Sequence, residues 1–495
     1  MSNDAIIRPV KESERIGALD ATRGLALLGI FMVNIGVFAM PFGEFVMPAP
    51  GEKESTLDRI VWVFNKVFCE GRFYPLFSML FGMGLVIQYR RARNAGRAFV
   101  APMFRRLLFL IAIGACHALL LWYGDILFMY GSFGLIMLAL VGRRPRTQFI
   151  VGGTLLAIVV FLGTAVGVFA IVTGGRSGSS DAPGSAPAAQ VEPGAAADST
   201  TDAATGSSSA PALVQDAAPP SDAAPASDAA PANDATAASD SPTTESADAP
   251  MTPDGPFERL MRLMRAPDYV GPSDPRHMEL ETQAFRDGPW LEAFLFRALT
   301  WAFFLGFSFA GFGWHVLGMF CIGAALIQLD IFSRARRRVH WWLVGIAFLV
   351  AAPITAATAL AQMGPNGWTV YALSAPVAYV FGPMISLGYL SAITLLVNGG
   401  IATALTGLLR AAGRMAFTNY LMQTIVSTFV FDFWGLGLFG SFSRGERVLF
   451  VVSVYAVQLV FSVLWLRVFT MGPFEWVWRT VTYLQPAPFL RRPPQ

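Results

Sequence analysis

The sequence predicts an all-α polytopic membrane protein with about ten transmembrane helices in two five-span halves. Hydrophobic residues make up 54% of its 495 residues and charged residues only 14%, whereas charged residues make up roughly a quarter of a typical soluble protein. Apolar runs of about 17 residues or more recur along the chain, and each is long enough to cross a bilayer as a helix. Arginines cluster at the ends of these runs, where they normally mark the cytoplasmic side of a membrane protein.

The N-terminal membrane half, residues 1–173, is expected to hold five spans behind a cytoplasmic N-terminus. Residues 1–17 are polar and have no short apolar segment with a cleavage site, so they do not form a signal peptide. Apolar and charged residues alternate with helical spacing over Ser55–Cys69, which indicates an interfacial helix. The five predicted spans are Ala18–Met40, Phe73–Tyr89, Arg105–Leu127, Ile126–Val141 and Phe149–Val172.

Residues 174–255 are rich in Ala, Pro, Ser, Asp and Gly, which predicts a disordered acidic linker in the periplasm. No Lys or Arg lies between Arg176 and Arg259, so the remaining chain is strongly basic. Its arginines gather at helix ends, where they act as topology signals rather than as a nucleic-acid site. We therefore expect a lipid bilayer around the protein and no nucleic-acid partner.

Residues 256–310 are predicted to form interfacial amphipathic helices. The segment Trp290–Phe309 is apolar but carries Glu292 and Arg297. If it crossed the membrane fully, the arginine cluster at residues 334–338 would lie outside the cell, so we expect it to lie along the interface or to enter the membrane only partly. The C-terminal half, residues 311–495, then has five spans and a cytoplasmic C-terminus. These spans are Phe312–Leu329, Trp341–Leu360, Val370–Val397, Met415–Phe433 and Val448–Phe469.

His117 is the first candidate functional residue, because it is a titratable group inside an apolar span. It lies twelve residues past Arg105, which is roughly 18 Å along a helix and beyond the midplane. An ionisable residue at that depth is costly and indicates a functional site with a partner. Asn34 lies eleven residues past Arg23, about 16 Å along the first span, and reaches a similar depth. The competing interpretation is a neutral histidine that hydrogen-bonds a neighbouring helix.

Asp125 lies near the end of the same span and is the predicted partner of the His117 ring. Its carboxylate would fix the histidine tautomer, His117 would act as a general base, and Asn34 or Arg72 would stabilise an oxyanion. Asp125 could equally cap the helix that it precedes, and Arg72 could only anchor its helix at the interface. The ion pair expected between Asp20 and Arg23, three residues apart, is structural.

Further candidates for substrate binding are polar residues in or beside the predicted spans, and Glu70, Arg72 and His315 lie toward the same outer side as His117. Asn419 and Gln423 share one helix face, which suits a binding site or hydrogen bonds between helices equally well. Cys69, Cys116 and Cys321 are isolated in the sequence, so we expect neither disulfides nor a metal site. The candidate substrate-binding residues are Glu70, Arg72, His315, Asn419 and Gln423.

Four separated motifs resemble the YeiB family of bacterial inner-membrane proteins, which carry a domain of unknown function. They are RIGALDATRGLALLGIFMVN (Arg15–Asn34), GRFYPLFSMLFGMG (Gly71–Gly84), GACHALLLWYGDIL (Gly114–Leu127) and GRMAFTNYLMQT (Gly413–Thr424). The first is also similar to the start of the wider transmembrane acyltransferase superfamily. That resemblance implies transfer of an acyl group from cytosolic acyl-CoA to a sugar across the membrane. Surface-sugar O-acetylases typically have histidine at the position of Asn34, and the heparan-type enzyme has asparagine.

The resemblance implies that a thioester donor enters from the cytoplasmic side, with its phosphates held by arginines. The candidate donor-binding residues are Arg90, Arg91, Arg105 and Arg106.

We therefore expect an acyl-CoA-dependent O- or N-acyltransferase acting on an outer-side sugar, lipid or small-molecule acceptor, without a metal. The alternatives are a small-molecule transporter that uses the same polar cavity, and a structural membrane scaffold. The sequence makes no prediction of the oligomeric state.

Overall fold

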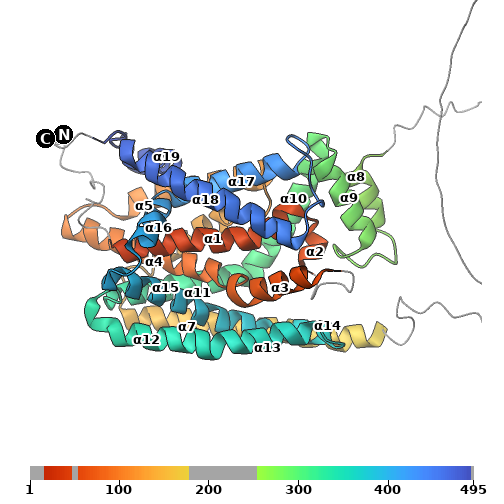
Figure 1. Cartoon of the computed structure of the whole chain (residues 1–495), viewed down its shortest axis with the longest axis horizontal. Coiled ribbons are helices and arrows are strands. Elements are labelled where there is room, and N and C mark those ends of the chain that lie inside the picture. The colour runs from red at the N-terminus through yellow and green to blue at the C-terminus, as the bar shows by residue number, and fades with distance from the viewer. Residues whose placement is uncertain (1–15, 47–53, 178–253, 492–495) are drawn as a thin grey trace, which may run out of the picture. The chain divides into compact units, whose positions relative to one another are not determined.

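The structure, a computed structural model, describes residues 16–46, 54–177 and 254–491, and these are mostly helical (Figure 1). The predicted all-α class is confirmed. The predicted linker over residues 174–255 lies outside the described residues except at its two ends, where α7 continues to Ser177 and α8 starts at Pro256. The described residues before and after that linker form one compact unit.

The first half contains a long helix for each predicted span except the fourth, which is short. The interfacial helix predicted over Ser55–Cys69 corresponds to α3 and a π-helical turn, Asn65–Cys69. The helices are α1 (Gly17–Ala39), α2 (Phe42–Val46), α3 (Thr56–Phe64), α4 (Phe73–Asn94), α5 (Val100–Leu120), α6 (Leu127–Met137) and α7 (Pro145–Ser177).

The second half begins with two short helices and then continues with long ones. Several of these are joined end to end by π-helical turns, as α10 is to α11 and α12 is to α13. The helices are α8 (Pro256–Leu263), α9 (Pro275–Arg286), α10 (Trp290–Phe307), α11 (Gly313–Gln328), α12 (Arg337–Gly345), α13 (Ala352–Gln362), α14 (Gly367–Ala372), α15 (Gly382–Gly399), α16 (Thr403–Arg414), α17 (Ala416–Phe431), α18 (Arg444–Val468) and α19 (Pro473–Tyr483).

Within the described residues, seven helices are long and apolar enough to span a membrane, so this is a multi-pass membrane protein. The count of ten is not confirmed and stays a prediction. The three other predicted spans correspond to α4, which carries Arg90, Arg91 and Arg93, and to the shorter helices α6 and α17. Large apolar side chains on α7, such as Phe161 and Phe169, are about 70% exposed (71% and 67%), as expected for a lipid-facing helix.

The segment Trp290–Phe309, expected as a separate interfacial helix, is instead the first half of a continuous 39-residue helix, Trp290–Gln328. The domain boundary expected at residues 310 and 311 therefore falls inside a helix. Arg297 made this segment ambiguous in sequence. In the structure its guanidinium is buried and lies 2.6 Å from the Asp432 carboxylate, so the charge is paired within the protein.

The two halves pack through glycines at close helix crossings. A Cβ atom at Gly323 of α11 would collide with the backbone of Met79 in α4, and one at Gly82 of α4 would collide with the backbone of Phe320. Small residues at such crossings let membrane helices approach closely. The halves therefore share one interior, and a site between α5 and α17 draws residues from both.

The helices run roughly parallel to the long axis of the bundle (Figure 1). Helices α8 and α9 lie at the right-hand end, and α16 and α19 lie toward the left-hand end. Helix α5 joins these ends, because the Arg106 carbonyl accepts a hydrogen bond from Trp478 of α19 while Tyr123, just past α5, packs against Phe285 of α9.

Candidate functional site

His117 lies in the last turn of α5 and not in the middle of a longer span. The helix ends at Leu120 because the backbone N–H groups of Leu121 and Trp122 both donate to the His117 carbonyl. The chain then turns through Gly124 and Asp125 into α6. The histidine is therefore closer to its end of the bundle than the predicted span, Arg105–Leu127, implied.

The His117 ring lies between a carboxylate and a hydroxyl group. Nδ1 lies 2.9 Å from Oδ2 of Asp125, close enough for an ion-pair contact although not aligned as a linear hydrogen bond. On the other side of the ring, Nε2 lies 2.9 Å from Oγ1 of Thr424, and these two atoms form a hydrogen bond. All three side chains are buried. The structure thus places an imidazole between an acid and an alcohol from three different parts of the chain.

Asp125 lies beside both of the groups that its sequence position suggested as partners. Oδ1 accepts a 2.7 Å hydrogen bond from the Phe128 N–H in the first turn of α6, while Oδ2 faces His117. A Cβ atom at Gly114 would lie 2.7 Å from Oδ1 and would collide with the Phe128 N–H. Gly114 therefore allows the turn with Asp125 to approach α5 closely enough for the carboxylate to reach the histidine.

Aromatic rings cover the histidine. The Trp122 ring lies edge-on to the imidazole at 6.3 Å between centroids and stacks on Phe38 of α1 at 4.2 Å. The Tyr420 ring lies 5.5 Å from the imidazole on another side. Tyr420 also lines a cavity, so a single side chain belongs to both the histidine site and this cavity.

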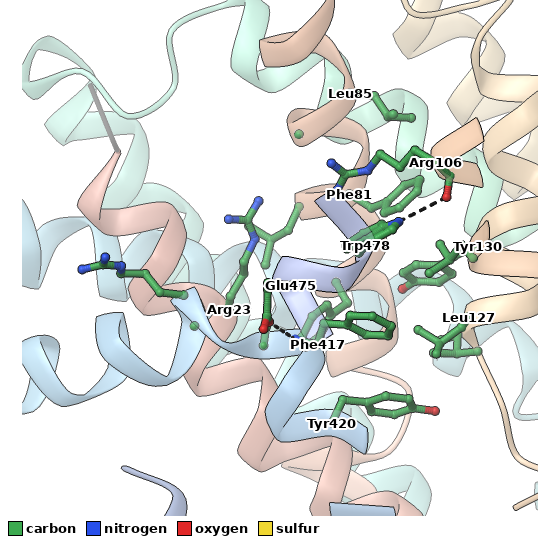
Figure 2. A pocket seen from close by; sticks show the side chains of 18 of the residues that line it. Arg23, Phe81, Leu85, Arg106, Leu127, Tyr130, Phe417, Tyr420, Glu475 and Trp478 are labelled. Atoms are coloured by element: carbon green, nitrogen blue, oxygen red, sulfur yellow. Dashed lines mark hydrogen bonds between the residues drawn. The ribbon is translucent and has the colours of Figure 1, made fainter. Parts of the chain in front are cut away.

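This cavity has a volume of about 260 Å³ and lies between α1, α4, α5, α6, α17 and α19 (Figure 2). In Figure 2, Arg106 lies toward the top, Arg23 left of centre, Trp478 and Phe417 near the middle, and Tyr420 toward the bottom. The charged lining residues are Asp20, Arg23, Arg106, Arg414, Glu475 and Arg479, and the apolar ones include Phe77, Leu80, Phe81, Leu110 and Leu127.

The charged end of the cavity has more arginines than acids. Arg23 pairs with Asp20 at 3.0 Å, which confirms the predicted ion pair. The Glu475 carboxylate accepts hydrogen bonds from the Phe417 and Thr418 N–H groups. The Arg106 guanidinium lies 3.9 Å from the centre of the Trp478 ring, an orientation that favours a cation. The excess of positive charge makes this end suitable for an anionic group.

Of the four predicted donor-binding arginines, only Arg106 lines the cavity. Arg105 donates to the Thr482 carbonyl at 3.2 Å, Arg90 is exposed, and Arg91 lies outside the cavity lining. Sequence reasoning missed Arg23, Arg414 and Arg479 as lining residues. It predicts Arg23 only as part of a structural ion pair, and Arg414 stands inside the GRMAFTNYLMQT motif.

The predicted substrate-binding residues do not line this cavity. Arg72 is buried and donates to the carbonyls of Lys66, Val67 and Glu70, so it holds the π-helical turn before α4. The Glu70 carboxylate lies 2.7 Å from the Lys66 ammonium and lines a separate cavity of about 60 Å³.

The other predicted substrate-binding residues contact neighbouring helices. His315 lies 3.4 Å from the Tyr74 hydroxyl and 3.4 Å from the Tyr379 carbonyl. Asn419 donates to Ser462 and Gln423 donates to Gln458, both on α18, as in the interhelical alternative.

Asn34 lies on α1 and is partly buried. Its neighbours Val33 and Ile35 line the smaller cavity, and the Val37 carbonyl accepts from Trp122 at 3.4 Å. Within the described part of the chain, no hydrogen bond joins Asn34 to His117.

A second buried polar group lies near this site and has no sequence signal. Glu281 of α9 is 1% exposed and accepts a 3.1 Å hydrogen bond from the Phe42 N–H. Burial raises the pKa of its carboxyl group to about 8 because a charged carboxylate is poorly solvated there. The Glu281 side chain therefore links α9 to the first residue of α2.

Comparison with known proteins identifies relatives along nearly the whole chain. Residues 326–485 match the family described as "Protein of unknown function (DUF418)". "Uncharacterized protein YxaH" of Bacillus subtilis (strain 168) is 26% identical and covers 98% of both chains. "Uncharacterized protein YeiB" of Escherichia coli (strain K12) is 27% identical over 97% of this chain and 99% of its own length. No solved structure matches.

Only part of the candidate site lies in the region that matches the family. Tyr420 and Thr424 lie inside residues 326–485, whereas His117 and Asp125 lie before them. The site therefore needs both the matched C-terminal region and the N-terminal helices.

Proposed function

We propose, from the premise that this chain belongs to the YeiB-type DUF418 family, that it is a membrane-bound acyltransferase. It takes an acyl group from acyl-CoA and passes it to a hydroxyl or amine of a sugar, lipid or small-molecule acceptor. His117 is the general base, and Asp125 orients and stabilises its ring. The donor occupies the cavity between α1, α5 and α19.

One observation carries this proposal. The His117–Asp125 pair lies one aromatic side chain, Tyr420, away from a cavity whose far end is rich in arginine. Arg106 and His117 are both on α5, eleven residues or about 16 Å apart along the helix. A donor with phosphates at Arg106 and a thioester at Tyr420 would lie along this length, which suits a ligand with a charged head and a long flexible arm.

The chemistry needs only groups that this site holds. Nε2 of His117 removes the proton from an attacking hydroxyl or amine as its oxygen or nitrogen bonds to the thioester carbonyl carbon. The carbon–sulfur bond breaks, and the leaving thiolate takes the proton from the imidazolium. Asp125, 2.9 Å from Nδ1, stabilises the imidazolium that forms in between. Asn34 remains a proposed oxyanion donor.

The test measures transfer of a labelled acetyl group. Membranes with the full-length protein are incubated with labelled acetyl-CoA and an envelope extract. The substitution His117→Gln is expected to lower the transfer rate by about 10²–10⁴-fold, the usual contribution of a general base. His340→Gln is the matched control, because that histidine is also buried and its Nε2 lies 2.8 Å from the Ile331 carbonyl, in another part of the bundle.

Unchanged transfer by a well-expressed His117→Gln variant would remove His117 as the base. If the protein instead moved a metabolite across vesicles without consuming acetyl-CoA, it would be a transporter and the proposal would fail.

A further inference from the structure

We infer that Thr424 is the nucleophile of this site and holds the acyl group as an ester before the acceptor receives it. This inference rests on the proposed acyl transfer, to which it adds a covalent step. It comes from the arrangement Asp125–His117–Thr424, in which one ring nitrogen faces a carboxylate and the other faces a hydroxyl group, each at 2.9 Å.

The contacts favour a donor role for the Thr424 hydroxyl. The carboxylate next to Nδ1 favours a proton on that nitrogen, which leaves Nε2 as a hydrogen-bond acceptor. The threonine has a single hydroxyl proton, and Nε2 at 2.9 Å is much closer than the alternative acceptor, the Tyr420 carbonyl at 3.5 Å. This is the order of an acid, a base and an alcohol that activates a nucleophile in acyl-transfer enzymes.

Thr424 differs from the other polar residues of α17 in its partner. Thr418 donates to Glu475, Asn419 to Ser462, and Gln423 to Gln458. Those contacts fasten α17 to α18 and α19. Thr424 instead contacts a histidine that can accept its proton.

Thr424 is also placed near the cavity. It lies four residues after Tyr420 on α17, so the two side chains occupy the same helix face about one turn apart. Tyr420 lines the cavity and lies against the imidazole. A thioester bound against the Tyr420 ring would therefore lie about one helical turn, roughly 5 Å, from Thr424.

Atoms and protons are conserved in both steps of the proposed transfer. Oγ1 of Thr424 attacks the thioester carbonyl carbon, its proton passes to Nε2 of His117, and the carbon–sulfur bond breaks. The thiolate takes that proton and leaves as free CoA. In the second step the acceptor hydroxyl attacks the ester carbon, its proton passes to Nε2, and Oγ1 recovers it as the ester bond breaks.

A threonine ester also removes a geometric difficulty. The donor cavity is charged at the α19 end, whereas His117 lies near the opposite end of α5. With a covalent intermediate, the donor can leave before the acceptor binds, so the two substrates need not share the buried site.

The experiment uses the full-length protein in detergent with labelled acetyl-CoA and no acceptor. The wild type is expected to release about one CoA per protein and to carry the label on the peptide that contains Thr424, from which hydroxylamine removes it. Thr424→Val should lose both the burst and the label, and Thr424→Ser should keep them. Thr428→Val is the matched control, since Thr428 lies one turn further along α17 and donates only to backbone carbonyls.

The outcomes separate the two proposals. If the wild type transfers acetyl groups but no label appears on Thr424, or if Thr424→Val transfers at the wild-type rate, the covalent step is wrong and acyl transfer stands. If the wild type releases CoA neither in this assay nor in the presence of an envelope extract, both proposals fail.

Discussion

The buried imidazole of His117 is tolerated because both of its nitrogens have polar neighbours. An ionisable group without a partner inside an apolar helix would be strongly destabilising, and here Asp125 and Thr424 supply the two neighbours. Only part of this arrangement could be predicted from the sequence. Asp125 follows His117 by eight residues across a turn, whereas Thr424 is 307 residues away, and no local pattern connects residues at that separation.

Arginine roles were the least predictable feature at the residue scale. Arg90 and Arg106 look equivalent in sequence because both lie in basic clusters next to apolar runs. In the structure Arg106 lines the cavity against Trp478, whereas Arg90 is exposed at the end of α4. Helix packing determines which of these arginines lines the cavity, and this cannot be derived from composition.

We predict that Arg106→Ala raises the KM for acyl-CoA by about 10-fold or more, because a charge-assisted hydrogen bond contributes about 1.5–3 kcal/mol. Arg90→Ala is the control and should leave KM unchanged. Initial rates at varied acyl-CoA concentration provide the measurement. An equal effect of both substitutions would mean that only the total positive charge of this membrane face matters.

At the scale of helices, hydropathy located most of the spans because a bilayer demands long apolar segments. It failed where a polar residue has a distant partner. Arg297 made Trp290–Phe309 look interfacial, yet its charge is paired with Asp432, 135 residues later in the chain, within a continuous helix. A buried ion pair of this kind is invisible to any window of sequence.

The crossing of α4 and α11 gives a prediction about packing. Gly323→Ala should destabilise the protein by about 1–3 kcal/mol, the usual cost of overpacking, because the new methyl group would collide with the Met79 backbone. Gly153→Ala on α7 is the control, since no heavy atom lies within 4 Å of its added Cβ. Thermal unfolding in detergent measures the difference. Equal melting temperatures would show that α4 and α11 can separate without cost.

For the whole molecule, the orientation of the bundle determines which substrate reaches which end. The arginines of the cavity lie toward the end that holds α16 and α19, and His117 lies toward the end that holds α9. If the arginine-rich end is cytoplasmic, as clusters of positive charge favour, an intracellular donor meets its binding groups directly. With the opposite orientation, a cytosolic thioester would have to enter beside His117.

Cysteine labelling tests this orientation across the helix Arg334–Gln362. Its 29 residues span about 44 Å, close to the full thickness of a bilayer, so its two ends lie on opposite sides. In a variant without Cys69, Cys116 and Cys321, we expect a membrane-impermeant maleimide to label Asn366→Cys on intact cells. Ala335→Cys, between two arginines at the other end, should react only after the membrane is permeabilised.

Both positions are exposed in the structure, so access to the reagent depends only on the side of the membrane. The same pair of variants in inside-out vesicles should give the reverse pattern, which controls for reactivity. Labelling of Ala335→Cys on intact cells would place the arginine-rich end of the cavity outside, and a cytosolic acyl-CoA could then no longer be its ligand.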